Sequence, residues 1–92
     1  MKLYLDDIRF PPNGFHLCRT AQEAMDWLGS GVVTFISFDH DLGTELTGYS
    51  VACYIEKSVF EGKFICPGWC VHSANPIGAD NIDRAMMSAS RF

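Results

Sequence analysis

The amino-acid sequence predicts a small α/β domain built on a mostly parallel β-sheet of about four strands. Short segments rich in β-branched and aromatic residues alternate with segments whose apolar residues recur at helical spacing, an order typical of a parallel sheet wrapped by helices. Hydrophobic residues make up 48% of the 92 residues, and seven Phe, three Tyr and two Trp supply large side chains for burial. A chain of this length builds one core, so we predict a single domain spanning residues 1–92.

The first part of the chain predicts two strands joined by a loop. Residues 2–5 form an apolar strand that ends at Asp6 and Asp7. Residues 10–14 contain two prolines followed by Asn and Gly, which exclude a helix and a central strand. Residues 15–19 are predicted as a second strand. Parallel neighbours usually need about a dozen crossover residues, and this loop offers fewer, so we expect the second strand to be short or irregular.

The middle of the chain predicts a helix and then a buried strand. Thr20 and Glu23 have the spacing of a capping box, so a helix should begin at Ala21 and end near residues 29–31, which include two glycines. Its apolar stripe consists of Ala21, Ala24, Met25 and Leu28. Residues 32–38 are almost all β-branched or aromatic, which predicts a central strand buried on both faces.

Two further helices and one strand are predicted in the second half. Thr47 is a candidate cap for a helix that reaches about Phe60. Residues 70–73 read as a strand, and Asn75 followed by Pro opens a last helix. The inward-facing residues expected on these helices are Val51, Ala52, Ile55, Val59, Ile82, Ala85, Met86 and Ala89.

The charge of the chain limits the classes of ligand. The formal net charge is −4, and the seven Lys and Arg residues form no cluster, which argues against binding to duplex nucleic acid. A small phosphorylated ligand remains compatible, because one or two cations and a metal ion can neutralise it locally. The apolar N-terminal run meets Asp6 and Asp7 too early for a signal peptide or membrane span, so we expect a cytoplasmic protein. The sequence is compatible with a monomer or a homo-oligomer.

Acidic residues follow the first and third predicted strands, and the polar residues His72, Ser73 and Asn75 close the fourth. The carboxyl ends of parallel strands meet at one edge of a sheet, so these side chains should converge. Three carboxylates about 5 Å apart repel one another by about 10 kcal/mol in total at an effective dielectric constant of about 20. A small domain has only about 5–15 kcal/mol of net stability, so the cluster must be solvated, protonated or balanced by a cation. Candidate metal ligands are Asp6, Asp7, Asp39 and Asp41.

Oxygen ligands favour Mg²⁺ or Mn²⁺, and a contribution from His40 or His72 would favour Mn²⁺ or another transition metal. Each single Asp also has an ordinary structural interpretation as a cap or turn residue. Asp39 either attacks phosphorus or binds the ion, and both roles need the same residue type. His40 and His72 are candidate general acids or bases, although a histidine beside a buried strand is often only a core residue.

Three further polar residues are candidates for binding phosphate. Arg9 lies close after the acidic pair, where its guanidinium could bind a phosphate or pair with Asp7. Ser73 and Asn75 lie at a strand end and a helix N-terminus, where they could donate to a phosphate. An ordinary helix cap is the alternative for Asn75.

The order of these residues resembles the receiver domain of two-component signalling. Asp6 and Asp7 match the acidic pair after the first strand, Asp39 the acceptor after the third, and Ser73 the hydroxyl residue after the fourth. The resemblance implies a flavodoxin-like, three-layer sandwich. The sequence departs from the family in two ways, because the Pro-Pro loop replaces the first helix, and no fifth strand with its phosphate-contacting Lys follows.

The chain more closely resembles the cyclic-phosphate processing receiver-like family of bacteria and phages. The matching motifs are Leu3-Tyr4-Leu5-Asp6-Asp7-Ile8-Arg9, Pro11-Pro12, Ser37-Phe38-Asp39-His40-Asp41-Leu42-Gly43, Thr47-Gly48-Tyr49 and His72-Ser73-Ala74-Asn75-Pro76. This resemblance implies processing of cyclic phosphate ends of RNA or of related nucleotides, in the host cytoplasm if a phage encodes the protein.

Three functions are compatible with these residues and motifs. The first is a metal-dependent phosphoesterase that opens a cyclic phosphate. The second is a non-catalytic sponge that captures a cyclic or signalling nucleotide, as a phage anti-defence protein would. The third is a degenerate receiver that acts by protein contact.

Overall fold

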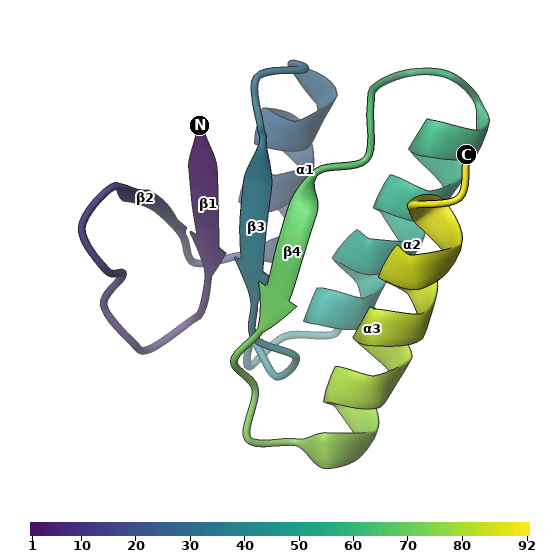
Figure 1. The fold of residues 1–92 in the computed structure, drawn as a ribbon. Coiled ribbons are helices and arrows are strands. Elements are labelled where there is room, and N and C mark those ends of the chain that lie inside the picture. Colours follow the sequence, from purple (N-terminus) through teal and green to yellow (C-terminus); the bar gives the residue numbers. More distant parts are fainter.

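A computed structural model describes all 92 residues. Four strands form one wholly parallel sheet in the order β2-β1-β3-β4 (Figure 1). The strands are β1 (Lys2–Leu5), β2 (Phe15–Cys18), β3 (Phe35–Phe38) and β4 (Gly68–Val71), and the helices are α1 (Ala21–Gly29), α2 (Gly48–Phe60) and α3 (Pro76–Ala89). None of the three helices has the combination of length and apolar composition that a membrane-spanning helix requires.

The predicted helices and their N-caps are confirmed, but the Glu23 side chain does not complete the predicted capping box with the Thr20 N–H. Thr20 Oγ1 accepts a hydrogen bond from the Glu23 N–H at 3.2 Å, at the start of α1. Thr47 and Ser50 form a reciprocal capping box at the start of α2. The Asn75 side chain caps α3, with Pro76 in its first turn. The predicted inward residues of α2 and α3 are buried, as are those of α1 except Met25, which is only partly buried.

Two strand predictions need correction. The third strand begins at Phe35 rather than at residue 32, because its neighbours β1 and β4 are short and Val32 lies beyond their pairing, with 49% of its surface exposed. The fourth strand covers Gly68–Val71 rather than residues 70–73, because Val71 pairs with Phe38 at the ends of both strands. The second strand is short, as expected, and it pairs regularly with β1.

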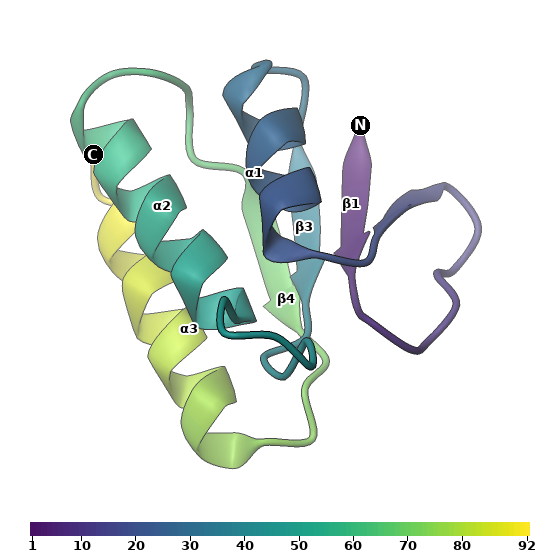
Figure 2. The same cartoon turned by 180° about the vertical axis from the view of Figure 1, so that it is seen from behind.

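The sheet and helices form two layers, and the expected three-layer sandwich is wrong. All three helices lie on one face of the sheet (Figures 1 and 2). The reason is the handedness of parallel connections. The chain moves across the sheet in one direction from β2 to β3 to β4, so right-handed crossovers place α1 and α2 on the same face, and α3 follows on that side. The connection from β1 to β2 runs the other way, and it carries a loop instead of the helix that would cover the second face.

The two faces of the sheet differ accordingly. On the covered face, the core contains Leu3, Leu5, Ile36 and Phe38, all fully buried. The opposite face, which we call the open face, carries the alternate residues of each strand. By the strand register these are Phe15 and Leu17 on β2, Lys2 and Tyr4 on β1, Phe35 and Ser37 on β3, and Gly68 and Cys70 on β4. The prediction that β3 is buried on both faces therefore holds for Ser37 and not for the half-buried Phe35.

Candidate functional site

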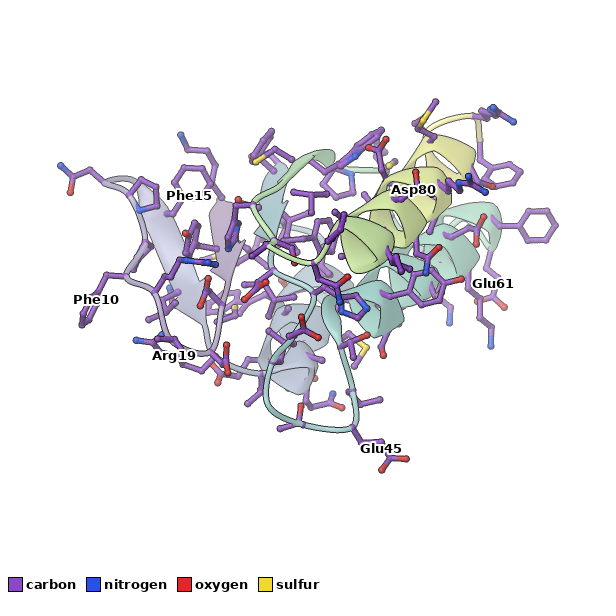
Figure 3. The ribbon with its side chains drawn as sticks, turned by 90° about the horizontal axis from the view of Figure 1, so that it is seen from below. Phe10, Phe15, Arg19, Glu45, Glu61 and Asp80 are labelled. Atoms are coloured by element: carbon purple, nitrogen blue, oxygen red, sulfur yellow. The ribbon has the colours of Figure 1, made fainter.

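Backbone pairing beyond the strand ends positions the site. The N–H of Asp6 donates to the Cys18 carbonyl at 3.1 Å, that of Asp39 to Leu5 at 2.8 Å, and that of His72 to Phe38 at 2.8 Å. Asp6, Asp39 and His72 therefore extend the ladder by one residue on three adjacent strands. The convergence predicted from the sequence is present, at the carboxyl edge of the sheet that Figure 3 views from below.

The Asp6 carboxylate is fully engaged by protein donors. Its Oδ1 accepts from the N–H groups of Ile8 (2.8 Å) and Arg9 (2.7 Å), and its Oδ2 accepts from Arg9 Nη1 (3.1 Å) and contacts His72 Nε2 (3.0 Å). Burial by itself would raise the pKa of Asp6, but these hydrogen bonds outweigh it and lower the pKa to about 2. Asp6 is therefore an ionised, buried anchor for the loop that follows β1.

Arg9 lies between two carboxylates of the site. Its Nη1 is 3.1 Å from Asp6 Oδ2 and 3.8 Å from Asp39 Oδ2. The alternative of a pair with Asp7 is wrong, because the turn closed by Asp6 directs the guanidinium across to β3. About half of the Arg9 side chain is exposed, and these contacts use only Nη1, so Nη2 and Nε remain to bind an anion. Arg9 thus supplies part of the positive charge that the sequence argument required.

A second arginine holds the same loop. Arg19 Nη1 donates to the Arg9 carbonyl at 3.0 Å and contacts the Asp6 carbonyl at 3.4 Å. Its guanidinium also lies over the exposed Phe10 ring, 5.6 Å from the ring centroid (Figure 3). Sequence reasoning missed Arg19, although its place directly after the second strand was a usable signal.

An open cavity of about 430 Å³ lies at this edge of the sheet. Its acidic lining consists of Asp6, Asp7, Asp39 and Asp41, beside Arg9 and Ala74. Carboxylate oxygens of Asp6, Asp7 and Asp39 lie within 4.8 Å of one another. Asp41 is outside this group, since its oxygens face His40 Nδ1 at 3.1 Å and Asn75 Nδ2 at 3.4 Å.

The three grouped carboxylates fit a hard divalent cation. The Asp7 carboxylate takes no part in the hydrogen bonds of the site, and Oδ2 of Asp39 has only the long contact with Arg9, so both offer unfilled oxygen lone pairs. Asp6 would share an oxygen only by loosening its contact with Arg9. The donor set is all oxygen, because neither histidine belongs to the group.

His72 is held within a chain of polar groups. Its Nδ1 is 2.7 Å from Ser37 Oγ and its Nε2 faces Asp6, while the Cys70 thiol donates to Ser37 Oγ at 3.2 Å. With the thiol donating to Ser37 and the Ser37 hydroxyl donating to Nδ1, a neutral His72 carries its proton on Nε2 and donates it to Asp6. The ring also stacks on Tyr4, with centroids 4.3 Å apart.

Sequence reasoning missed Ser37 and Tyr4 as partners of the site. A polar residue inside an apolar strand was the available signal for Ser37. Tyr4 is two residues before Asp6, so the strand alternation places both on one face. Burial, and then the Asp6 charge, raise the pKa of Tyr4.

The remaining candidates are less directly aimed at the cavity. The His40 ring packs against Gly78 of α3, where an added Cβ would overlap it. Ser73 Oγ accepts from the Asn75 N–H at 3.0 Å, and Asn75 Oδ1 accepts from the Gly78 N–H at 3.0 Å. The ordinary cap interpretation of Asn75 is therefore present in the structure. Neither histidine lines the cavity.

The parallel strand order, the acidic pair after β1, Asp39 after β3 and Ser73 after β4 define a receiver-like domain without the first helix of a full receiver. The family model of the cyclic-phosphate processing receiver domain matches residues 1–88. The chain belongs to this family. Searches of curated proteins and of solved structures found no match.

Proposed function

We propose that the protein is a metal-dependent phosphoesterase that opens a cyclic phosphate on an RNA end or a cyclic nucleotide. The observation that carries the proposal is the grouping of three carboxylates, with oxygens within 4.8 Å, beside a half-exposed arginine in an open cavity. Such a site combines groups that hold a divalent cation with a group that binds phosphate. Membership of the cyclic-phosphate processing family supports the choice of linkage.

Asp7 and Asp39 would hold Mg²⁺ or Mn²⁺, with one oxygen of Asp6 as a third ligand, and Asp41 at the cavity wall would reach the ion only through water. The bound ion would polarise a phosphoryl oxygen and lower the pKa of water.

Arg9 would bind a second phosphoryl oxygen with its unused N–H groups. Ser73 and Asn75 flank Ala74, which lines the cavity, and their side chains would complete the phosphate site. Water attacks phosphorus, one ester P–O bond breaks, and the released sugar oxygen takes a proton to give a hydroxyl and a phosphate monoester. Asp39 accepts the proton of the attacking water, and His40 returns a proton through water to the sugar oxygen, because its Nε2 has no partner. His72 acts as a positioning residue that holds Asp6 and, through it, Arg9.

The test is turnover of defined substrates. The protein and its Asp39→Asn variant are incubated with RNA ending in a 2′,3′-cyclic phosphate and with a panel of cyclic nucleotides, in Mn²⁺, Mg²⁺ or chelator. Asp80→Asn is the matched control, because Asp80 is exposed on α3 and pairs only with Arg84. Products are separated by chromatography and identified by mass. We expect product to form only with metal, at the wild-type rate in Asp80→Asn. In Asp39→Asn the rate should fall by a factor of at least about 100. Turnover that persists in chelator or in Asp39→Asn would contradict the proposal.

One observation favours a second candidate, the non-catalytic sponge. No imidazole lines the cavity, so a site that binds a phosphorylated nucleotide without cleaving it is also consistent with the geometry. The same samples test this function when they are compared before and after heating. A sponge depletes intact nucleotide from solution and releases it unchanged on denaturation, and that result would replace the phosphoesterase.

A further inference from the structure

The open face of the sheet carries a connected set of aromatic rings. Tyr4 and Phe15 meet edge to face with centroids 6.1 Å apart, and Phe15 meets Phe35 in the same way at 6.1 Å. His72 covers Tyr4 from the side of the site. Phe15 and Phe35 remain partly exposed. Partly exposed rings on a sheet are surfaces on which planar groups stack.

This aromatic surface is continuous with the acidic site. Asp6 and Asp39 follow Tyr4 and Ser37 by two residues, and His72 follows Cys70 by two, so the three site residues project on the same side of the sheet as the open face. A ligand with its phosphate in the cavity can therefore extend over the His72 ring, which covers the buried Tyr4, and reach Phe15 without crossing the sheet edge.

The charge of the open face suits an anionic chain. Lys2 is exposed, and its ammonium lies 4.8 Å from the centroid of the Phe15 ring. None of the open-face residues on the four strands is acidic, so the carboxylates are confined to the end that would hold the metal. Arg19 adds a cation beside that end.

The size of the face argues against a protein partner. Four strands about 4.8 Å apart and four residues long at about 3.3 Å per residue give a surface of about 19 by 13 Å, or about 250 Å². A stable protein interface buries about 800 Å² on each partner. The face is therefore too small by itself for a lasting homodimer, but it has room for a few bases of a single strand.

We infer that the open face stacks unpaired bases next to the phosphate in the cavity, so that the ligand is a short single-stranded RNA end rather than a free cyclic nucleotide. The inference rests on the proposed function, because the phosphate in the cavity sets the end of the strand. Phe15 and Phe35 supply the stacking surface, and Lys2 contacts the phosphate backbone.

The test compares a tetranucleotide ending in a 2′,3′-cyclic phosphate with the corresponding mononucleotide, in the presence of Mg²⁺ or Mn²⁺. Turnover is measured for both. Affinity is measured by anisotropy with a fluorescent tetranucleotide that carries a 3′-phosphate, and the mononucleotide is titrated as its competitor. Phe15→Leu and Phe35→Leu remove rings while keeping apolar volume. Phe60→Leu is the matched control, because this ring is 70% exposed at the end of α2.

We expect wild type to bind the tetranucleotide more tightly than the mononucleotide. In each open-face variant the KM and Kd for the tetranucleotide should rise about 5- to 100-fold. The corresponding constants for the mononucleotide should change much less. Phe60→Leu should change neither constant for the tetranucleotide. Lys2→Gln, which keeps all the rings but removes the ammonium beside Phe15, should weaken binding and make its salt dependence shallower.

Equal affinity for the two ligands would overturn the inference while leaving the proposed phosphoesterase intact if both are cleaved. If wild type binds the tetranucleotide but does not turn it over, and the Phe variants no longer bind it, the stacking surface would be supported and the catalytic proposal rejected. Self-association that Phe35→Leu abolishes would assign the face to a second copy of the chain and also overturn the inference.

Discussion

Replacing Asp6 with Asn should make the unfolding free energy of the protein less dependent on pH in the acid range. The folded-state pKa of about 2 lies below the ordinary value of 3.8. Asp6 therefore stabilises the fold fully above about pH 4, and this contribution is lost as the pH falls towards about 2. A difference of this size in the pKa of one carboxyl corresponds to about 2 kcal/mol of stability.

The structure also gives the cost of the variant at neutral pH. Asn keeps an oxygen for the N–H groups of Ile8 and Arg9, but it presents an amide donor where Oδ2 accepts from Arg9 and His72. Losing two bonds to a charged acceptor should cost about 2–4 kcal/mol. His72 should also change tautomer, because its Nε2 must then accept and its Nδ1 must donate to Ser37.

The assay is urea unfolding from pH 7 down to pH 2 in chelator, for wild type, Asp6→Asn and the control Asp80→Asn, with the His72 tautomer followed by ¹⁵N NMR. The stability difference between wild type and Asp6→Asn should shrink by about 2 kcal/mol between pH 5 and pH 2. Parallel pH profiles for the two proteins would refute the assignment of Asp6 as a buried, ionised anchor, and an unchanged His72 tautomer would refute the hydrogen-bond chain.

Three further outcomes follow from the site and core. Arg9→Gln should tighten Mn²⁺ binding and weaken phosphate binding in calorimetric titrations, because the guanidinium competes with the ion for Asp6 and Asp39; a change of the same sign in both would contradict this. Gly48→Ala should lower the unfolding free energy by about 1–3 kcal/mol, since the new Cβ would overlap the Asp39 backbone carbonyl; wild-type stability in urea would show that the contact is not tight. In thiol labelling at pH 8, exposed Cys70 should react rapidly, whereas Cys18, whose pKa burial raises to about 12, should react only on unfolding; early Cys18 labelling would argue against its burial.

Local sequence signals were sufficient for the helices. The caps at Thr20, Thr47 and Asn75 and the apolar stripes behind them depend on neighbours within one or two turns, so helix starts and buried faces were predicted correctly. Strand limits depend instead on pairing partners. Val32 and Val33 have strand-forming side chains but lie beyond the backbone pairing with β1 and β4, which ends at Thr34. Their own sequence does not encode this limit.

The layer count shows a different kind of error. The Pro-Pro loop predicts that the first helix is absent, but the loop by itself does not show which face of the sheet this leaves uncovered. The strand order makes that connection the one that runs opposite to the others, so its missing helix leaves one face open. The open face thus follows from topology rather than from the composition of any strand.

The sequence by itself determined that acidic residues follow the first and third strands and that a histidine lies near the end of the fourth, because strand ends are local features and parallel strands share an edge. Only the tertiary structure decided what these residues do to one another. Arg9 pairs with Asp6 and Asp39 instead of Asp7, His72 joins Asp6 to Ser37, and Asp41 stands outside the carboxylate group. These outcomes depend on side-chain directions across strands distant in sequence, which are fixed only when the sheet assembles.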